Sequence, residues 1–296
     1  MNLAGVLAPI PTPFDESGRV DETRLKKALR RWLKTPLVGF VVLGSTGEAV
    51  LLDDDEAERV IAAARAVVPR KRTFIVGTGR ESTRSAIRAA KRAARHGADA
   101  ILVRTPGFYK NAMTADAFVD HYTAVADASP VPVLLYNFTA LTGVELPVEA
   151  VGVLARHPNV IGMKESGSDV MRLTDLTAFA SDNFRLLAGS ATTFHQALAV
   201  GAVGGILAAA CVVPEVCVRL YQLTMSGRQE EARALQQRLL PMVKLLVSGY
   251  GVPGLKAAAT LAGYDSGFPR SPLLPVPDAV VAELRQTLAA FESAAP

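Results

Sequence analysis

Cysteine and histidine are scarce in this sequence, which has two cysteines and four histidines among its 296 residues. Cys211 and Cys217 lie in a nearly uncharged stretch, and the histidines do not show the spacing of metal ligands. Disulfide frameworks and structural zinc sites need more of these residues at characteristic intervals. We therefore expect buried free thiols in a reducing cytoplasm, and no metal site.

Charged residues are also few, at 20% of the chain with a net charge of +4. The basic ones are scattered through amphipathic segments such as residues 84–95, where they are interleaved with alanine. A nucleic-acid surface would instead show a basic stripe with interleaved aromatic residues. The pattern indicates solvated helix faces that attract small anions weakly, and no nucleic-acid partner.

No segment has the character of a signal peptide or a membrane span. The amino terminus lacks a basic stretch and is interrupted by prolines. Residues 196–214 are uncharged, but Gly201, Gly204 and Gly205 within them indicate a helix end followed by a buried strand. We expect a cytoplasmic protein that does not bind a membrane.

Half of the residues are hydrophobic, and short apolar runs alternate with longer segments of helical period. Continuous hydrophobicity is typical of strands that are buried on both faces in a parallel sheet. The expected strands are residues 6–8, 39–43, 73–78, 100–103, 133–136, 160–164, 185–188 and 204–207. The expected helices between and after them are residues 21–34, 53–67, 82–96, 114–128, 147–157, 168–181, 192–200 and 214–226.

Eight strands that are each followed by a helix predict an α/β fold, a closed (β/α)8 TIM barrel. Ser82, Thr114 and Ser168 are expected to begin three of the helices as capping residues. The alternation ends near residue 228, and residues 229–247, 253–262 and 278–290 have the pattern of appended helices. We divide the chain into a barrel of residues 1–227 and a C-terminal helical extension of residues 228–296 that packs on it.

In such barrels the catalytic and ligand-binding residues lie at the carboxyl ends of the strands. Lys164 ends the sixth expected strand, Tyr136 lies near the end of the fifth, and Tyr109 follows the fourth. An ammonium group taken out of water gives up its proton more readily, and the neutral amine attacks a ketone or aldehyde to form an imine. A lysine at a strand end can also simply extend into solvent or pair with a neighbour such as Glu165.

The turn of residues 44–48, GSTGE, places two hydroxyls between glycines after the second strand. Backbone amides in such a turn approach an anion closely, so it could hold a carboxylate beside the amine of Lys164. An imine with a 2-oxo acid is an electron sink through which neighbouring carbon–carbon bonds form or break. Tyr136 could then shuttle protons, or it could be an ordinary aromatic residue of the barrel mouth.

Five motifs together resemble the dihydrodipicolinate synthase / N-acetylneuraminate lyase family of class I Schiff-base aldolases. The resemblance runs from residue 6 to residue 275, which is nearly the whole chain. The motifs are GSTGE (44–48), TPGFYK (105–110), LLYNFTALTG (134–143), VIGMKESGSD (160–169) and AGSATTFHQALAVGAVGGI (188–206).

The resemblance implies that Lys164 forms the imine and that Tyr136 is the proton relay. It implies that Ser45 and Thr46 hold the substrate carboxylate and polarise this relay. It also implies that Tyr109 is lent across a tight dimer within a homotetramer, a dimer of dimers. Gly47, Gly189 and Ile206 complete the expected substrate-binding residues at the same barrel mouth.

Four positions bear on which reaction the family resemblance implies. Dihydrodipicolinate synthases carry an arginine for the second substrate where this chain has Leu141, and an aliphatic side chain cannot bind a carboxylate. Sialate lyases carry an acidic pair where this chain has Ala191 and Thr192. The carboxyl half is most similar to 4-hydroxy-2-oxoglutarate aldolases, although Thr46 stands where the animal form of that enzyme has asparagine.

We expect an enzyme, a carbon–carbon lyase that cleaves or forms a 4-hydroxy-2-oxo acid such as 4-hydroxy-2-oxoglutarate from pyruvate and an aldehyde such as glyoxylate. Lys164 would form the imine and Tyr136, assisted by Thr46, would take the proton of the carbon-four hydroxyl. No cofactor is expected, because the imine is the electron sink. The alternatives are a 2-keto-3-deoxy sugar acid aldolase or dehydratase, a dihydrodipicolinate synthase-like enzyme, and a 2-oxo acid sensor without activity.

Overall fold

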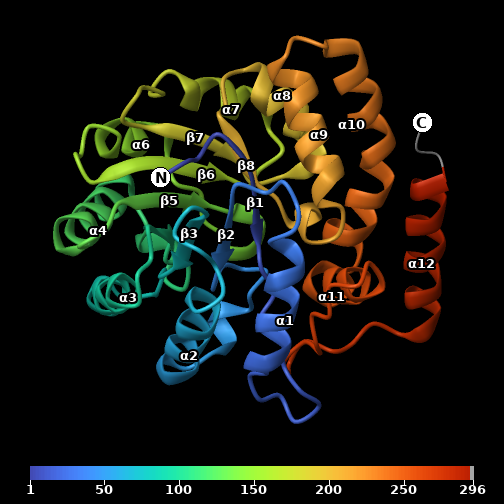
Figure 1. Ribbon diagram of the computed structural model, residues 1–296. Helices are drawn as coiled ribbons and strands as arrows, with labels where there is room; N and C mark the ends of the chain where they lie inside the picture. Colours follow the sequence, from blue (N-terminus) through green and yellow to red (C-terminus); the bar gives the residue numbers. More distant parts are fainter. Residues whose placement is uncertain (294–296) are drawn as a thin grey trace.

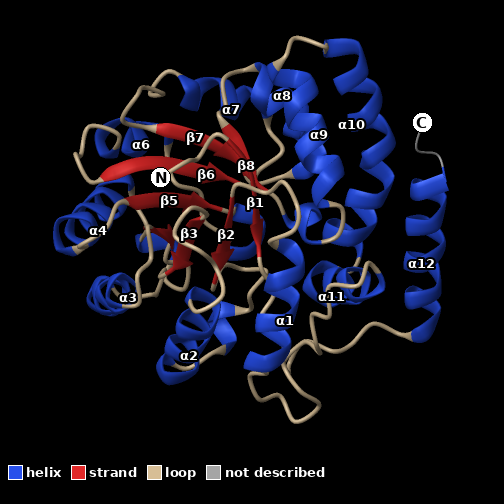
Figure 2. Cartoon of the chain, viewed as in Figure 1, coloured by secondary structure: helices blue, strands red, loops and turns tan. Residues whose placement is uncertain are grey.

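Eight parallel strands form a closed barrel in the computed structural model, which describes residues 1–293 and the side chains of all of these except 247, 248, 292 and 293. Each strand pairs with its neighbours in chain order, and β8 pairs with β1 to close the ring (Figures 1 and 2). The strands are β1 (Gly5–Pro9), β2 (Gly39–Val42), β3 (Thr73–Gly77), β4 (Ala100–Arg104), β5 (Val133–Asn137), β6 (Val160–Glu165), β7 (Arg185–Ala188) and β8 (Gly204–Ile206). The predicted TIM barrel is confirmed, with every strand at its expected place.

Helices follow the strands and surround the barrel (Figure 1). The helices of the barrel are α1 (Glu22–Trp32), α2 (Asp54–Arg65), α3 (Thr83–Arg95), α4 (Ala115–Ala128), the short α5 (Thr139–Thr142), α6 (Val148–Leu154), α7 (Val170–Thr177), α8 (Phe194–Ala199) and α9 (Pro214–Met225). Short 3-10 turns lie at η1 (Ala49–Leu51), η2 (Lys110–Ala112), η3 (Ala191–Thr193) and η4 (Ala208–Cys211).

The helix starts follow the capping chemistry of the sequence, with one correction. Ser82 and Thr114 accept hydrogen bonds from the backbone N–H three residues on, as expected of N-caps. The cap of α7 is Asp169 rather than Ser168, because its carboxylate accepts from the backbone N–H groups of Met171 and Arg172. A carboxylate at a helix start also interacts favourably with the helix dipole, which a hydroxyl does not match.

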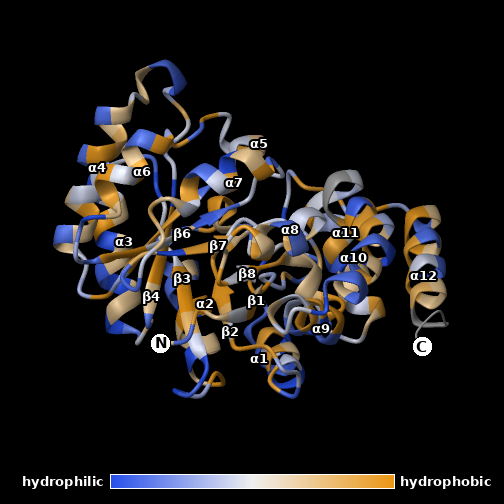
Figure 3. Ribbon diagram, turned by 90° about the horizontal axis from the view of Figure 1, so that it is seen from above, coloured by the Kyte–Doolittle hydropathy of each residue, from blue (hydrophilic) through white to orange (hydrophobic). Residues whose placement is uncertain are grey.

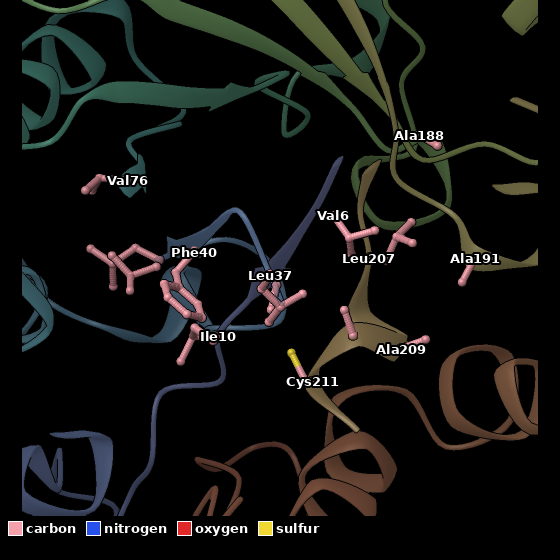
Figure 4. Close-up of a cluster of buried hydrophobic side chains, with 14 of the residues drawn as sticks. Val6, Ile10, Leu37, Phe40, Val76, Ala188, Ala191, Leu207, Ala209 and Cys211 are labelled. Carbon is pink, nitrogen blue, oxygen red and sulfur yellow. The ribbon is translucent and has the colours of Figure 1, made fainter. Parts of the chain in front are cut away.

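The hydrophobic residues of the strands separate into two layers. Residues that point into the barrel, such as Leu102, Leu134 and Ile206, form a small interior cluster. Residues that point outward pack against the helices in one large cluster, part of which, with Val6 and Phe40 among the labelled side chains, is drawn in Figure 4. In Figure 3 β3 and β4 have strongly hydrophobic colours, whereas the outer helices carry hydrophilic and hydrophobic stretches. Successive side chains of a strand point to opposite faces of the sheet, so every second strand residue points at the barrel axis.

Three further helices follow the barrel: α10 (Gln229–Val243), which continues into the π-helical η5 (Lys244–Gly249), α11 (Gly251–Leu261) and α12 (Asp278–Ser293). Buried residues of α10 and α11, such as Leu239 and Leu255, belong to the same outer cluster as the barrel helices. Figure 1 shows α12 at the edge of the molecule, beside α10 and α11. The extension therefore shares its core with the barrel; the division at residue 228 stays a prediction, and residues 294–296 of it lie outside the described chain.

Both cysteines are free and buried in the outer cluster, as expected. Burial raises the pKa of the Cys217 thiol to about 12, so this group stays protonated and unreactive at neutral pH. Burial raises the pKa of the Cys211 thiol as well. None of the helices in residues 1–293 combines the length and the apolar character that a membrane span requires.

Candidate active site

Lys164 and Tyr136 lie side by side at the carboxyl end of the barrel. They are paired residues in the register of β5 and β6, and both side chains are buried, with exposed fractions of 6% and 4%. The Nζ atom of Lys164 lies 4.3 Å from the centroid of the Tyr136 ring. No carboxylate of the described residues forms an ion pair with this amine, so Lys164 is neither extended into solvent nor paired with Glu165.

Glu165 faces away from Lys164 and ties the ends of β5 and β6 together. Its carboxylate accepts hydrogen bonds from Asn137 Nδ2 at 2.9 and 3.0 Å, from Arg172 Nε at 2.9 Å and from the backbone N–H of Gly167 at 2.7 Å. Arg172 and Glu165 are both buried, and the charge of Glu165 is balanced by Arg172, which also pairs with the exposed Glu145 at 3.3 Å. Asn137 directly follows Tyr136 in the chain, and Glu165 directly follows Lys164. This network therefore fixes the backbone positions of the tyrosine and the lysine.

The turn after β2 has an unusual backbone. Leu43 and Glu48, on either side of the GSTG segment, adopt left-handed conformations with φ of 57° and 54°. Such conformations cost about 1–3 kcal/mol each for residues other than glycine and persist only where the surroundings enforce them. A Cβ on Gly77 of β3 would lie 1.9 Å from the carbonyl oxygen of Leu43, so glycine is needed there for the turn to pack against β3. The strained turn is thus held in place by its neighbours.

Ser45 is the residue of this turn that reaches the tyrosine. Its Oγ lies 3.2 Å from the hydroxyl of Tyr136, within hydrogen-bonding distance. Thr46 is nearly buried but makes no hydrogen bond with any residue in the described part of the chain. The predicted assistance of the relay by Thr46 therefore stays a prediction, and the observed contact of Tyr136 is with Ser45.

The C-terminal extension anchors the turn from behind. Lys256 of α11 is buried and forms an ion pair with Glu48, and its Nζ donates to the carbonyl oxygens of Thr12 (2.7 Å) and Phe268 (2.6 Å). The backbone N–H of Arg270 donates to the other carboxylate oxygen of Glu48 at 2.8 Å. Burial lowers the pKa of Lys256 to about 8, against the effect of Glu48, which raises it.

The remaining expected substrate-binding residues lie at or below the same end of the barrel. Gly47 donates its N–H to the carbonyl oxygen of Gly44 at 3.1 Å, which closes the turn. Gly189 follows β7, and a Cβ there would lie 2.0 Å from Ser166 Oγ, so only glycine allows this approach. Ile206 is fully buried in the interior cluster. Their contacts with a substrate stay a prediction.

Tyr109 lies apart from this group. It is 74% exposed, and its ring packs edge-on against that of Phe108 at 5.1 Å between centroids. It makes no hydrogen bond with Lys164 or Tyr136 in the single chain. The expectation that a second copy of the chain brings this tyrosine to the site stays a prediction.

Arg104 is a residue of the site that the sequence reasoning missed. It is the last residue of β4, it pairs with Tyr136 in the strand register, and it follows Ala100 and Leu102 on the face that points into the barrel. A pocket at this end is lined by Ser45, Tyr136 and Arg104, among others. The alternation of strand residues could have identified it, because every second residue shares a face.

The polar groups that surround the amine are suited to imine chemistry. Among residues 1–293, no group of three or more histidine, cysteine, aspartate or glutamate side chains could hold a metal ion. A buried amine, an adjacent phenol and a hydroxyl that contacts this phenol are the parts that nucleophilic and proton-transfer catalysis require.

The sequence is similar to that of known proteins over nearly its whole length. A family model described as "Dihydrodipicolinate synthetase family" matches residues 2–291. The "4-hydroxy-tetrahydrodipicolinate synthase" of Acidiphilium cryptum (strain JF-5) is 35% identical over 284 residues, which are 96% of this chain and 97% of the relative. The "Probable 4-hydroxy-2-oxoglutarate aldolase, mitochondrial" of Emericella nidulans is 37% identical over 273 residues, which are 90% and 88% of the two chains.

Solved structures of similar proteins have the same fold. YagE of E. coli K12, a prophage protein of the dihydrodipicolinic acid synthase family solved in complex with pyruvate, superposes with a TM-score of 0.91 at 28% identity. The superposition covers 99% of this chain and 99% of that one. The pyruvate complex of the Acinetobacter baumannii dihydrodipicolinate synthase has a TM-score of 0.92 at 29% identity, and 98% and 99% of the chains are covered.

Proposed function

The chain belongs to the Dihydrodipicolinate synthetase family, and on that premise we propose that it is a pyruvate-dependent class I aldolase that cleaves or forms 4-hydroxy-2-oxo acids. Membership of this family makes the chain an enzyme of the Schiff-base-forming lyases. The observation that carries the proposal is the buried amine of Lys164, which has no carboxylate partner among the described residues and lies over the ring of Tyr136. The substrate that we propose is 4-hydroxy-2-oxoglutarate.

The first step joins the substrate to the protein. The neutral amine of Lys164 attacks the carbon-two ketone, and loss of water from the resulting carbinolamine leaves an imine. Tyr136 donates the proton with which the hydroxyl leaves as water. The carboxylate beside the ketone is held by the turn of residues 44–48, where Ser45 and Thr46 offer hydroxyls and Gly47 closes the turn through its hydrogen bond to Gly44.

The second step breaks the bond between carbons three and four. Tyr136, whose hydroxyl contacts Ser45, takes the proton of the carbon-four hydroxyl, and the carbonyl of the aldehyde forms there. The electron pair of the broken bond moves into the imine and gives an enamine of pyruvate on Lys164. Protonation at carbon three and hydrolysis of the imine then release pyruvate. No metal or organic cofactor is needed in this proposal, because the imine accepts the electrons.

Product analysis tests this reaction directly. The protein is incubated with 4-hydroxy-2-oxoglutarate, and pyruvate and glyoxylate are measured together over time. Equal amounts of the two products support the aldolase. A 2-oxo acid with its carbon chain intact and no pyruvate would instead identify a dehydratase, because loss of hydroxide proceeds from the same imine.

A second candidate is a synthase of the kind named in most of the similar relatives, which is supported by the Acidiphilium and Exiguobacterium proteins at 35% and 34% identity. Leu141 speaks against it, because this side chain is aliphatic and 63% exposed and cannot bind a carboxylate. A 2-keto-3-deoxy sugar acid aldolase is the third candidate, and it differs from the first only in the aldehyde.

The proposal includes an assembly and a location. We propose a cytoplasmic homotetramer, a dimer of dimers, in which Tyr109 completes the site of a neighbouring copy. The exposed aromatic pair of Phe108 and Tyr109 supports this, because aromatic side chains are enriched in the interfaces between subunits. Sedimentation of the wild-type chain and of Tyr109→Ser measures whether the assembly depends on this loop.

A further inference from the structure

Arg104 brings a guanidinium to the carboxyl end of the barrel, where the mechanism above gives it no task. It ends β4 and pairs in register with Tyr136 of β5, which in turn pairs with Lys164 of β6. Adjacent strands lie about 4.8 Å apart. The three residues therefore form a row along the barrel rim, with the arginine on the far side of the tyrosine from the lysine.

The side chain of Arg104 has hydrogen-bond donors to spare. Its Nη1 pairs with Glu81 at 2.8 Å and donates to the carbonyl oxygen of Thr105 at 3.0 Å. Its Nε and Nη2 make no hydrogen bond with any of the residues that the structure describes. A guanidinium carries five N–H donors in a planar fork that matches a carboxylate. A second anion can therefore bind beside Glu81.

Glu81 keeps Arg104 in place and is itself held. Burial opposes the ionisation of Glu81, but hydrogen bonds from the backbone N–H groups of Phe108 and Gly107 and from Arg104 outweigh it and lower the pKa of this carboxyl. Gly79 contributes space, because a Cβ there would lie 2.4 Å from Arg104 Cγ. The position of the guanidinium is thus built by its neighbours.

The row of side chains matches the order of groups along a dicarboxylic substrate. In 4-hydroxy-2-oxoglutarate the carbon-two ketone joins Lys164, the carbon-four hydroxyl faces Tyr136, and carbon five carries a second carboxylate. This carboxylate comes next in the substrate, as Arg104 comes next in the row. Arg104 and Tyr136 line one pocket together with Ser45, so the arginine and the tyrosine face the same space.

We propose that Arg104 is a specificity residue that binds the distal carboxylate of a dicarboxylic 2-oxo acid bound at Lys164. The inference rests on the proposed imine chemistry and names its substrate class. It assigns to β4 the carboxylate recognition that Leu141, in the short helix α5 after β5, cannot provide. Monocarboxylic 2-oxo acids of equal length leave the free donors of Arg104 without a partner, which disfavours them.

The test compares imine formation by two 2-oxo acids of the same length, so that it needs no turnover. The protein is incubated with 2-oxoglutarate or with 2-oxopentanoate over a range of concentrations, reduced with borohydride, and the adduct is quantified by mass spectrometry. Pyruvate, which has no distal group, is the reference. A charge-assisted hydrogen bond predicts a preference of the wild type for 2-oxoglutarate of about 10-fold or more in half-saturating concentration.

Three variants separate a direct contact from a general effect of charge. Arg104→Leu is expected to lose the preference for 2-oxoglutarate, while its half-saturating concentration of pyruvate changes less than about 2-fold. Arg104→Lys is expected to retain part of the preference. Arg80→Leu is the matched control, because Arg80 is a nearby arginine that pairs with Asp54 and does not line the pocket. This control should keep the preference.

Several results would overturn the inference. They are a wild type that binds both acids equally, an Arg104→Leu protein that keeps the preference, and an Arg80→Leu protein that loses it to the same degree. If Arg104→Leu does not fold, the preference for 2-oxoglutarate is compared between the wild type and Arg104→Lys, and an undiminished preference in Arg104→Lys would overturn the inference. Failure to cleave 4-hydroxy-2-oxoglutarate with the preference intact would overturn the proposed aldolase reaction and leave the role of Arg104 standing.

Discussion

The Oγ atom of Ser45 lies 3.2 Å from the hydroxyl of Tyr136, which joins the turn after β2 to the end of β5. This contact orients the phenol whose proton the proposed reaction moves twice. It also links the group that would hold the substrate carboxylate to the group that would perform the chemistry.

Removal of the phenol hydroxyl should therefore slow the reaction without preventing binding. Tyr136→Phe is expected to lower kcat by about 10²- to 10⁴-fold, the usual contribution of a positioned acid or base. Ser45→Ala removes one hydrogen bond from the phenol and should lower kcat by about 10-fold. Steady-state kinetics measures both. Tyr250→Phe, which removes a hydroxyl bonded to Glu283 in the extension, is the control and should keep the wild-type kcat; a Tyr136→Phe protein of full activity would contradict the relay.

The buried pair of Lys256 and Glu48 should contribute strongly to stability. Lys256→Met leaves the carboxylate of Glu48 buried without its cation, which costs about 3–5 kcal/mol in comparable sites. Urea unfolding gives the free energy of unfolding of both proteins. Lys244→Met alters an exposed lysine of the same extension, and a change within about 0.5 kcal/mol is expected there. Equal effects of the two substitutions would show that the buried pair does not anchor the turn.

Glu165 should matter for stability and for imine formation together. Glu165→Gln leaves the buried Arg172 with only the exposed carboxylate of Glu145, at 3.3 Å, and a loss of about 3 kcal/mol is expected. Because Glu165 orients the strand ends that carry Tyr136 and Lys164, the rate of imine formation with pyruvate should also fall. Glu149→Gln alters an exposed carboxyl of α6 and should change neither quantity. Imine formation at the wild-type rate in a destabilised Glu165→Gln protein would restrict this network to a role in folding.

The stability of the protein should decrease in acid because of His121. Burial lowers the pKa of this histidine to about 4, while Glu81 raises it and Arg104 lowers it to a smaller extent. Its Nε2 has no hydrogen-bond partner among the described residues. Between about pH 6.5 and pH 4 the unfolded chain binds a proton that the folded chain does not, so stability is lost as the pH falls through this range, by about 3 kcal/mol at most. Urea unfolding of His121→Gln at pH 7.5 and pH 4.5 should show a smaller loss than the wild type. An equal loss in both would assign the effect to other groups.

The sequence predicted the barrel well because its signal is local. Each strand is a continuous apolar run, and the glycines and prolines that end the helices stand directly before the strands. Lys164 and Tyr136 were found by the same logic, since both stand at the ends of such runs. The four-residue helix α5 was not expected, because a single turn has no periodicity to detect. The expected helix of residues 229–247 ends as a regular helix at Val243, and Pro241, which lacks an N–H, stands just before the π-helical turn.

The contacts that position the site could not be read from the sequence. Glu48 and Lys256 lie far apart in the chain, and nothing in either segment indicates the other. The choice of Ser45 over Thr46 as the contact of Tyr136 depends on the backbone of a turn with two left-handed residues. Arg104 shares its face with Ala100 and Leu102, but a charged residue at the end of an apolar run has the appearance of a simple strand end.

Location of the pyruvate adduct tests the central claim most directly. The wild-type protein is incubated with pyruvate, reduced with borohydride and digested, and the modified peptide is identified by mass spectrometry. We predict one modified lysine, Lys164, and no adduct in Lys164→Arg. An adduct on Lys256, the other buried lysine of the described chain, or an unchanged adduct in Lys164→Arg, would contradict the account.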